Sequence, residues 1–124
     1  MLTNSIMGAE GSGVMAYSRE TAYNIWNLEI GNQEYGYDFS GKKIKKSEYG
    51  RPNEVGWIIA HIKPEKLGGP DNDGNIMIMH HRTLAEKGYN YPEFSIDHKK
   101  YRVCYEEKKD YYYIEEIVEE DDED

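Results

Sequence analysis

The sequence predicts a single α+β domain, because three patterns of secondary structure follow one another along the chain. Residues 17–31 carry apolar side chains at helical spacing, and residues 33–50 alternate aromatic and polar side chains about a Ser-Gly turn. Residues 57–88 indicate strand, loop, strand and helix in succession. A length of 124 residues allows one modest core. We therefore expect a central strand-strand-helix unit that is preceded by a helix and a hairpin.

The predicted N-terminal helix begins at Ser18, whose hydroxyl can cap the first turn. Gly31 suits a left-handed stop after the last turn. The apolar positions between them recur at i, i+3, i+4 and i+8, and are Ala22, Ile25, Trp26 and Ile30. We expect Trp26 to anchor the core.

The hairpin predicted for residues 33–50 contains the run "GKKIKK". Four lysines crowd these six residues and are candidate ligand-binding groups: Lys42, Lys43, Lys45 and Lys46. They form either a phosphate-binding surface or an ordinary solvated hairpin.

The central unit begins with the apolar run at residues 57–62, which Pro64 and the Gly68-Gly69-Pro70 breaker close. A second strand at 75–79 leads into helix formers at 80–88. Near the C-terminus, residues 100–118 indicate two tyrosine-rich strands joined by a Lys-Lys-Asp turn. The tyrosines there are expected to form a cross-strand ladder.

Composition divides the chain into three parts. Residues 1–14 are small, polar and Gly-rich, and are expected to be a disordered leader or cloning residues outside the fold. Residues 15–114 form the predicted domain. Residues 115–124 hold eight of the 24 acidic groups, so the other 114 residues carry 15 basic against 16 acidic groups, a net charge of −1. The formal charge of −9 therefore belongs to an acidic tail, which either stays solvated or competes with nucleic acid for a basic surface.

A single cysteine, Cys104, excludes an internal disulfide and a structural zinc cluster of thiolates. No stretch approaches the roughly 20 apolar residues of a membrane span. We expect a cytoplasmic protein of a bacterial cell, with no membrane partner.

The pattern "GW..AHI.P...GG.....N...MH..T..EK" resembles the HNH branch of the His-Me finger endonucleases, in particular small bacterial and phage proteins. Those proteins have a DHI motif, then GG, then NL, then H-x-x-TN-x-x-K. Upstream, "SRETAYNIW" and "YDFSGKKIKKSEYG" occupy the places of an Ile-Trp helix and an Asp-x-x-Gly hairpin. The resemblance covers residues 16–92 and implies a ββα unit.

The resemblance implies metal-assisted hydrolysis of a phosphodiester. His61 matches the general base that activates water, a role that suits an imidazole. Asn75 matches the asparagine that ties the loop between the strands, His80 the histidine that opens the helix, and Lys87 the helix lysine. The family holds one divalent ion, which stabilises the developing negative charge.

The two metal-ligand positions of the family do not match. Ala60 stands where Asp is expected, and Leu84 where the helical Asn or His is expected. Neither side chain has a lone pair to offer a hard cation, so we expect no metal there. An engineered Asp-to-Ala change would explain Ala60 but not Leu84.

We therefore expect a degenerate HNH-like protein, from a phage or mobile element, that acts by binding and needs no cofactor. Its partner is a phosphate-containing ligand, a nucleic acid, or a host defence protein that itself binds nucleic acid; His61, Lys63 and the lysine-rich hairpin favour phosphate. An assembly of identical copies is left open.

Two alternatives stay open. One is a working nickase whose Mg²⁺ or Mn²⁺ is held by Asp71, Asp73 or His80. The other is an interaction protein whose old cleft is filled by side chains, with Leu84 reaching towards Ala60.

Overall fold

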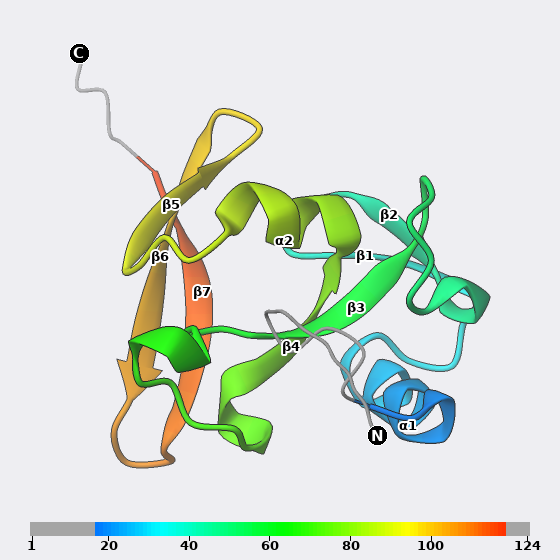
Figure 1. Cartoon of the computed structure of the whole chain (residues 1–124), viewed down its shortest axis with the longest axis horizontal. Helices are drawn as coiled ribbons and strands as arrows, with labels where there is room; N and C mark the ends of the chain where they lie inside the picture. The colour runs from blue at the N-terminus through cyan, green and yellow to red at the C-terminus, as the bar shows by residue number, and fades with distance from the viewer. Residues whose placement is uncertain (1–16, 119–124) are drawn as a thin grey trace.

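The computed structural model describes residues 17–118, which form an α+β fold with three small antiparallel sheets (Figure 1). The helices are α1 (Arg19–Glu29) and α2 (His81–Lys87). The sheets pair β1 (Tyr35–Tyr37) with β2 (Lys43–Lys45), β3 (Trp57–His61) with β4 (Ile76–His80), and β5 (Glu93–Ile96) with β6 (Lys99–Glu106) and β7 (Tyr111–Ile117). Three short 3-10 helices connect them: η2 (Lys46–Glu48), η3 (Glu65–Leu67) and η4 (Asp73–Asn75).

Helix α1 forms where its capping and apolar pattern predicted. The Ser18 hydroxyl accepts a hydrogen bond from the Thr21 amide at 3.1 Å. Ala22 and Trp26 are fully buried, and the Trp26 ring lies 5.1 Å from that of Trp57 on β3. The helix thereby packs its apolar face against the central hairpin.

Strands β3 and β4 form the centre of the molecule, and β4 continues directly into α2 (Figure 1). All five residues of β3 are buried, because one face packs against α1 and the other lies towards α2. Trp57 and Ile59 join the first core, together with Ile44 from β2. Ile58 and Ala60 point to the opposite face, as the alternation of a strand requires.

A second core lies beneath the three-stranded sheet, which stands at the left of Figure 1. Phe94, Ile96, Tyr101 and Val103 pack there with Ile62. Phe39, from the β1–β2 hairpin, meets the Tyr101 ring edge-on at 5.0 Å and so links the hairpin to this sheet. Strand β5 was not expected from the sequence, whereas the β6–β7 hairpin was.

The two ends of the predicted domain differ in what the structure describes. Strand β7 extends to Ile117, so the acidic tail expected from residue 115 begins inside a strand, where Glu115 pairs with Arg102 at 3.2 Å. The expected leader, residues 1–14, and the end of the tail, 119–124, lie outside the described residues. Neither helix of the described part is long and apolar enough to cross a membrane.

Candidate functional site

The loop between β3 and β4 is held in shape by Asn75, which is fully buried. Its side-chain oxygen accepts from the Lys63 amide at 2.8 Å, and its amide group donates to the carbonyls of Lys63 and Pro70 at 2.9 and 2.8 Å. Gly69 lies so close that an added Cβ would sit 1.9 Å from the Lys63 carbonyl oxygen. Asn75 therefore closes the loop between β3 and β4.

His61 ends β3 and is brought against two carboxylates by this loop. Its Nε2 lies 2.9 Å from Asp71 Oδ1 and 3.8 Å from Glu65 Oε2. The imidazole is 8 % exposed, whereas the two carboxylates are 66 % and 49 % exposed. Asp71 thus fixes the orientation of a mostly buried ring and is itself open to solvent.

Ala60 and Leu84, which occupy the positions where the resemblance places the metal ligands, lie in one apolar cluster. Ala60 is fully buried with Ile58 and Met79, and Leu84 packs against this group from α2. Because neither side chain offers a donor atom, Mg²⁺ or Mn²⁺ does not fit at these positions. Positions 60 and 84 therefore contribute to an apolar contact between β3 and α2.

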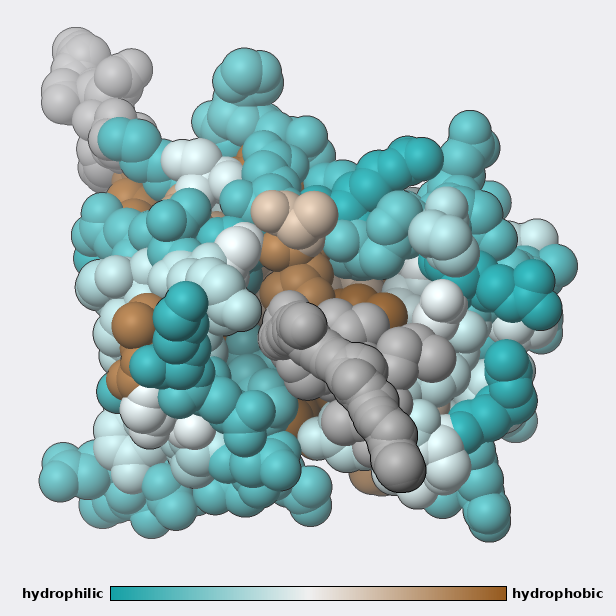
Figure 2. Space-filling view, in the orientation of Figure 1, coloured by the Kyte–Doolittle hydropathy of each residue, from teal (hydrophilic) through white to brown (hydrophobic). Residues whose placement is uncertain are grey.

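A shallow cavity of about 180 Å³ opens beside His61. Leu84, Gly88 and Tyr89 line it on the α2 side, and Pro64, Glu65 and Lys66 line it from η3 and the residue before it. Figure 2 shows apolar surface in the middle of this face, next to α2. Leu84 therefore contributes to the wall of the cavity and leaves it open.

The cluster around His61 offers a different set of metal donors. Single donor atoms of His61, Glu65 and Asp71 all lie within 4.8 Å of one another. One imidazole and two carboxylates are a donor set that Mn²⁺ and similar ions accept. Asp73 and His80, which were considered as metal ligands with Asp71, are not part of this cluster.

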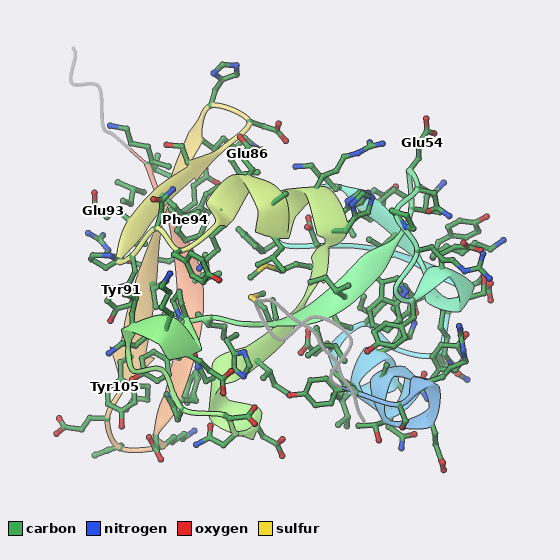
Figure 3. All side chains as sticks on the ribbon, viewed as in Figure 1. Glu54, Glu86, Tyr91, Glu93, Phe94 and Tyr105 are labelled. Atoms are coloured by element: carbon green, nitrogen blue, oxygen red, sulfur yellow. The ribbon has the colours of Figure 1, made fainter. Side chains whose placement is uncertain are left out.

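His80 acts as the cap of α2. Its Nδ1 accepts from the Arg82 amide at 3.0 Å, and its Nε2 donates to the carbonyl of Glu54, labelled in Figure 3, at 2.8 Å. These contacts require the neutral ring with its proton on Nε2. Burial lowers the pKa of His80, which favours the same neutral form.

Lys87 is 1 % exposed at the end of α2, and its ammonium lies 5.2 Å from the centre of the Phe94 ring. Phe94 belongs to β5, the strand of the three-stranded sheet that contacts α2 (Figure 3). Burial lowers the pKa of Lys87 to about 8. Lys87 is thus a core residue and does not line the cavity.

The five lysines proposed as ligand-binding groups lie outside the cavity beside His61. Lys42 forms a 2.8 Å ion pair with Asp97, and Lys63 lies 5.2 Å above the Tyr91 ring. Lys43, Lys45 and Lys46 lie on the hairpin and its end, and none of them lines the cavity beside His61.

Sequence reasoning missed three groups here, Glu65, Lys66 and Tyr89. The i, i+4 spacing of His61 and Glu65 gave no usable signal, because His61 ends strand β3 and η3 begins only at Glu65. No family model, curated protein or solved structure matches this chain.

Proposed function

We propose that this protein is a catalytically degenerate relative of the HNH nucleases, which acts by binding and does not cleave. The observation that carries the proposal is the contact of Leu84 with the apolar cluster of Ala60, at the end of the strand that presents His61. The order β3, β4, α2 and the loop held by Asn75 support the ββα relationship. A phage or mobile-element origin and a role against host defence stay predictions.

The absence of a metal at these positions matters because, in metal-assisted hydrolysis of a phosphodiester, the ion supplies most of the charge stabilisation. A bound divalent ion contributes several kcal/mol to the transition state, and each 1.36 kcal/mol is about tenfold in rate. His61 alone can activate water, but no positive charge then stabilises the oxygen of the leaving group. A slowdown of about a thousandfold or more follows.

The cavity itself is a poor place for a phosphate. The carboxylates of Asp71 and Glu65 lie 2.9 and 3.8 Å from His61 Nε2, so negative charge already stands beside the ring. A phosphate brought against His61 would face both of them. The phosphate-containing partner is therefore expected on another surface of the molecule.

A plasmid-nicking assay with Mg²⁺ or Mn²⁺ tests the proposal. The wild-type chain is expected to stay at background, and Ala60→Asp with Leu84→Asn to nick at least about a hundredfold faster, because the change restores both ligand positions. Adding His61→Ala to that double variant should return it to background. Wild-type nicking that His61→Ala abolishes would overturn the proposal, and a folded double variant without activity would count against the HNH relationship.

A second candidate is a nickase with a displaced metal at His61, Glu65 and Asp71, which the proximity of their donor atoms favours. A bound ion would replace the 2.9 Å hydrogen bond between His61 and Asp71, and would supply the Lewis acid that positions 60 and 84 lack. The residues fit such an ion by their chemistry, since two carboxylates offset its charge.

A Mn²⁺ titration, in which the electron paramagnetic resonance signal measures the concentration of free ion, distinguishes this candidate from a protein that binds no metal. If the displaced site exists, Asp71→Asn and Glu65→Gln should each weaken binding at least about tenfold, because each removes one anionic ligand. Asp73→Asn is the matched control, since Asp73 is an exposed acid of the same loop outside the cluster. Equal effects of all three changes would exclude a specific site.

A further inference from the structure

The outer face of the β1–β2 hairpin combines tyrosines and lysines without an acidic residue. Tyr35 pairs with Lys45 and Tyr37 with Lys43 across the two strands. Between them, Gly36 and Ile44 turn inward to the core. Lys43 and Lys45 place their ammonium groups 4.6 and 5.5 Å from the centre of the Tyr35 ring.

The same chemistry continues on α1, which packs beside the hairpin. Lys46 lies 5.2 Å from the Tyr23 ring and donates to Asn27 at 3.0 Å. Arg19 lies 5.6 Å from that ring and donates to its hydroxyl at 2.9 Å. We call the whole set the tyrosine–lysine surface, and its members are Arg19, Tyr23, Tyr35, Tyr37, Lys43, Lys45 and Lys46.

The charge of this surface is positive although the chain is acidic. Of the acidic residues next to these positions in sequence, Asp38 is buried and Glu48 accepts a hydrogen bond from Asn53 at 2.8 Å. Glu20 and Glu34 are exposed nearby and Glu48 keeps its charge, so four cationic groups stand against three carboxylates. Eight of the 24 acidic residues of the chain are among its last ten residues, and none of the eight is a member of the tyrosine–lysine surface as defined above.

The rings are available for stacking. Tyr37 is 64 % exposed and Tyr35 44 % exposed, although both are large aromatic residues. Bases of any sequence stack on exposed aromatic rings, while neighbouring lysines neutralise the phosphates between them. The ammonium groups that now lie over Tyr35 and Tyr23 sit on flexible stems, so they can turn to phosphate as a base replaces them.

We propose that the tyrosine–lysine surface binds single-stranded nucleic acid. A duplex hides its base faces and offers no partner to Tyr35 and Tyr37, whereas a single strand offers both bases and phosphates. This inference rests on the proposed function, because it names the ligand of a protein that acts by binding. None of the residues of the tyrosine–lysine surface lines the cavity beside His61. Binding and the former cleavage site are thus spatially separate.

Fluorescence anisotropy with a labelled oligothymidylate of about 15 nucleotides tests this surface. The measurement is made in EDTA, so that cleavage plays no part. Lys43→Ala with Lys45→Ala should weaken binding at least about tenfold and reduce the salt slope by about 1.4, because two phosphate contacts are lost. Tyr35→Ala with Tyr37→Ala should weaken binding by at least about tenfold with an unchanged slope.

Matched controls lie on the β6–β7 hairpin. Lys108→Ala with Lys109→Ala makes the same charge change at the turn, and Tyr111→Ala with Tyr113→Ala removes two exposed rings. Both should change affinity less than about twofold, since neither touches the proposed contacts. Thermal unfolding of each variant verifies that it folds.

Single-stranded RNA and a DNA duplex of the same length complete the experiment. Tighter binding of either single strand than of the duplex supports the proposal. Equal losses in test and control variants, equal binding of the duplex, or no binding of any oligomer would overturn it. Plasmid nicking by the wild-type chain would instead overturn the proposed function and leave this inference standing, so the two failures are distinguishable.

Discussion

At the scale of single residues, Lys87 is unusual because its charged side chain is almost completely buried. A buried ammonium is costly because the interior solvates it poorly, and the Phe94 ring at 5.2 Å offsets only part of that cost. Among the described residues, no carboxylate is paired with it. Its pKa of about 8 expresses this balance.

The sign of the resulting pH dependence follows from that shift. Between about pH 8 and the ordinary value of 10.5, the unfolded chain keeps the lysine proton and the folded chain does not. The free energy of unfolding of the wild type should therefore rise by about 3 kcal/mol across this window relative to Lys87→Met. Tyrosines also titrate in this pH range, but their contribution to the free energy of unfolding is common to wild type and Lys87→Met and cancels in the difference.

Urea unfolding at pH 7 to 10 checks this prediction. Lys87→Met should be the more stable protein at neutral pH, and its advantage should shrink as the pH rises. Lys66→Met is the matched control, because Lys66 is exposed, and its difference from wild type should stay flat. A pH-independent difference for Lys87→Met would show that the ammonium is not buried in solution.

At the scale of elements, local signals in the sequence were sufficient wherever the turn chemistry was ordinary. The Ser18 cap, the apolar stripe and Gly31 located α1, and the Ser-Gly turn located the β1–β2 hairpin. Strand β5 was missed because it has only four residues and its turn to β6 is made by Asp97 and His98, with φ of 52° and 71°. Non-glycine residues rarely adopt that conformation, so the turn carried no recognisable signal.

The candidate site was predictable only in its motif. Spacing along the chain identified His61 and Asn75, but the approach of Asp71 to His61 depends on the path of the chain through residues 62–71. That path is determined by the three hydrogen bonds of Asn75 and by the close fit of Gly69. Sequence periodicity contains no information on such a path, which is why the acidic partners of His61 were not assigned.

At the scale of the whole molecule, one buried carboxylate joins three parts of the fold. Asp38, 7 % exposed, accepts from the Ser40 hydroxyl and amide and the Lys42 amide within its own hairpin. Its other oxygen accepts from the His80 amide at 2.9 Å and the Thr83 hydroxyl at 2.6 Å. The hairpin that carries the tyrosine–lysine surface is thereby attached to the junction of β4 and α2.

Replacing Asp38 with Asn should therefore destabilise the whole domain. An amide group has one acceptor oxygen, so donors at His80, Thr83 or Ser40 are left unsatisfied in the interior at a cost of about 3 kcal/mol. The hydrogen bonds, first that of Thr83, lower the pKa of Asp38 against the opposing effect of burial. The stabilisation is thus complete above the unfolded-state pKa of about 3.9 and is lost as the pH falls through it towards the folded-state value.

Urea unfolding of wild type and Asp38→Asn from pH 7 to 3 measures this contribution. The difference in the free energy of unfolding should stay constant down to about pH 5 and shrink below about pH 4, because the carboxylate of residue 38 then takes up a proton in the unfolded wild-type chain before it does so in the folded one. Asp97→Asn is the matched control, since its carboxylate is exposed and forms a surface ion pair with Lys42, and the change should alter stability little. A difference that persists undiminished at pH 3 would mean that shape, and not the charge of Asp38, joins the hairpin to the rest of the molecule.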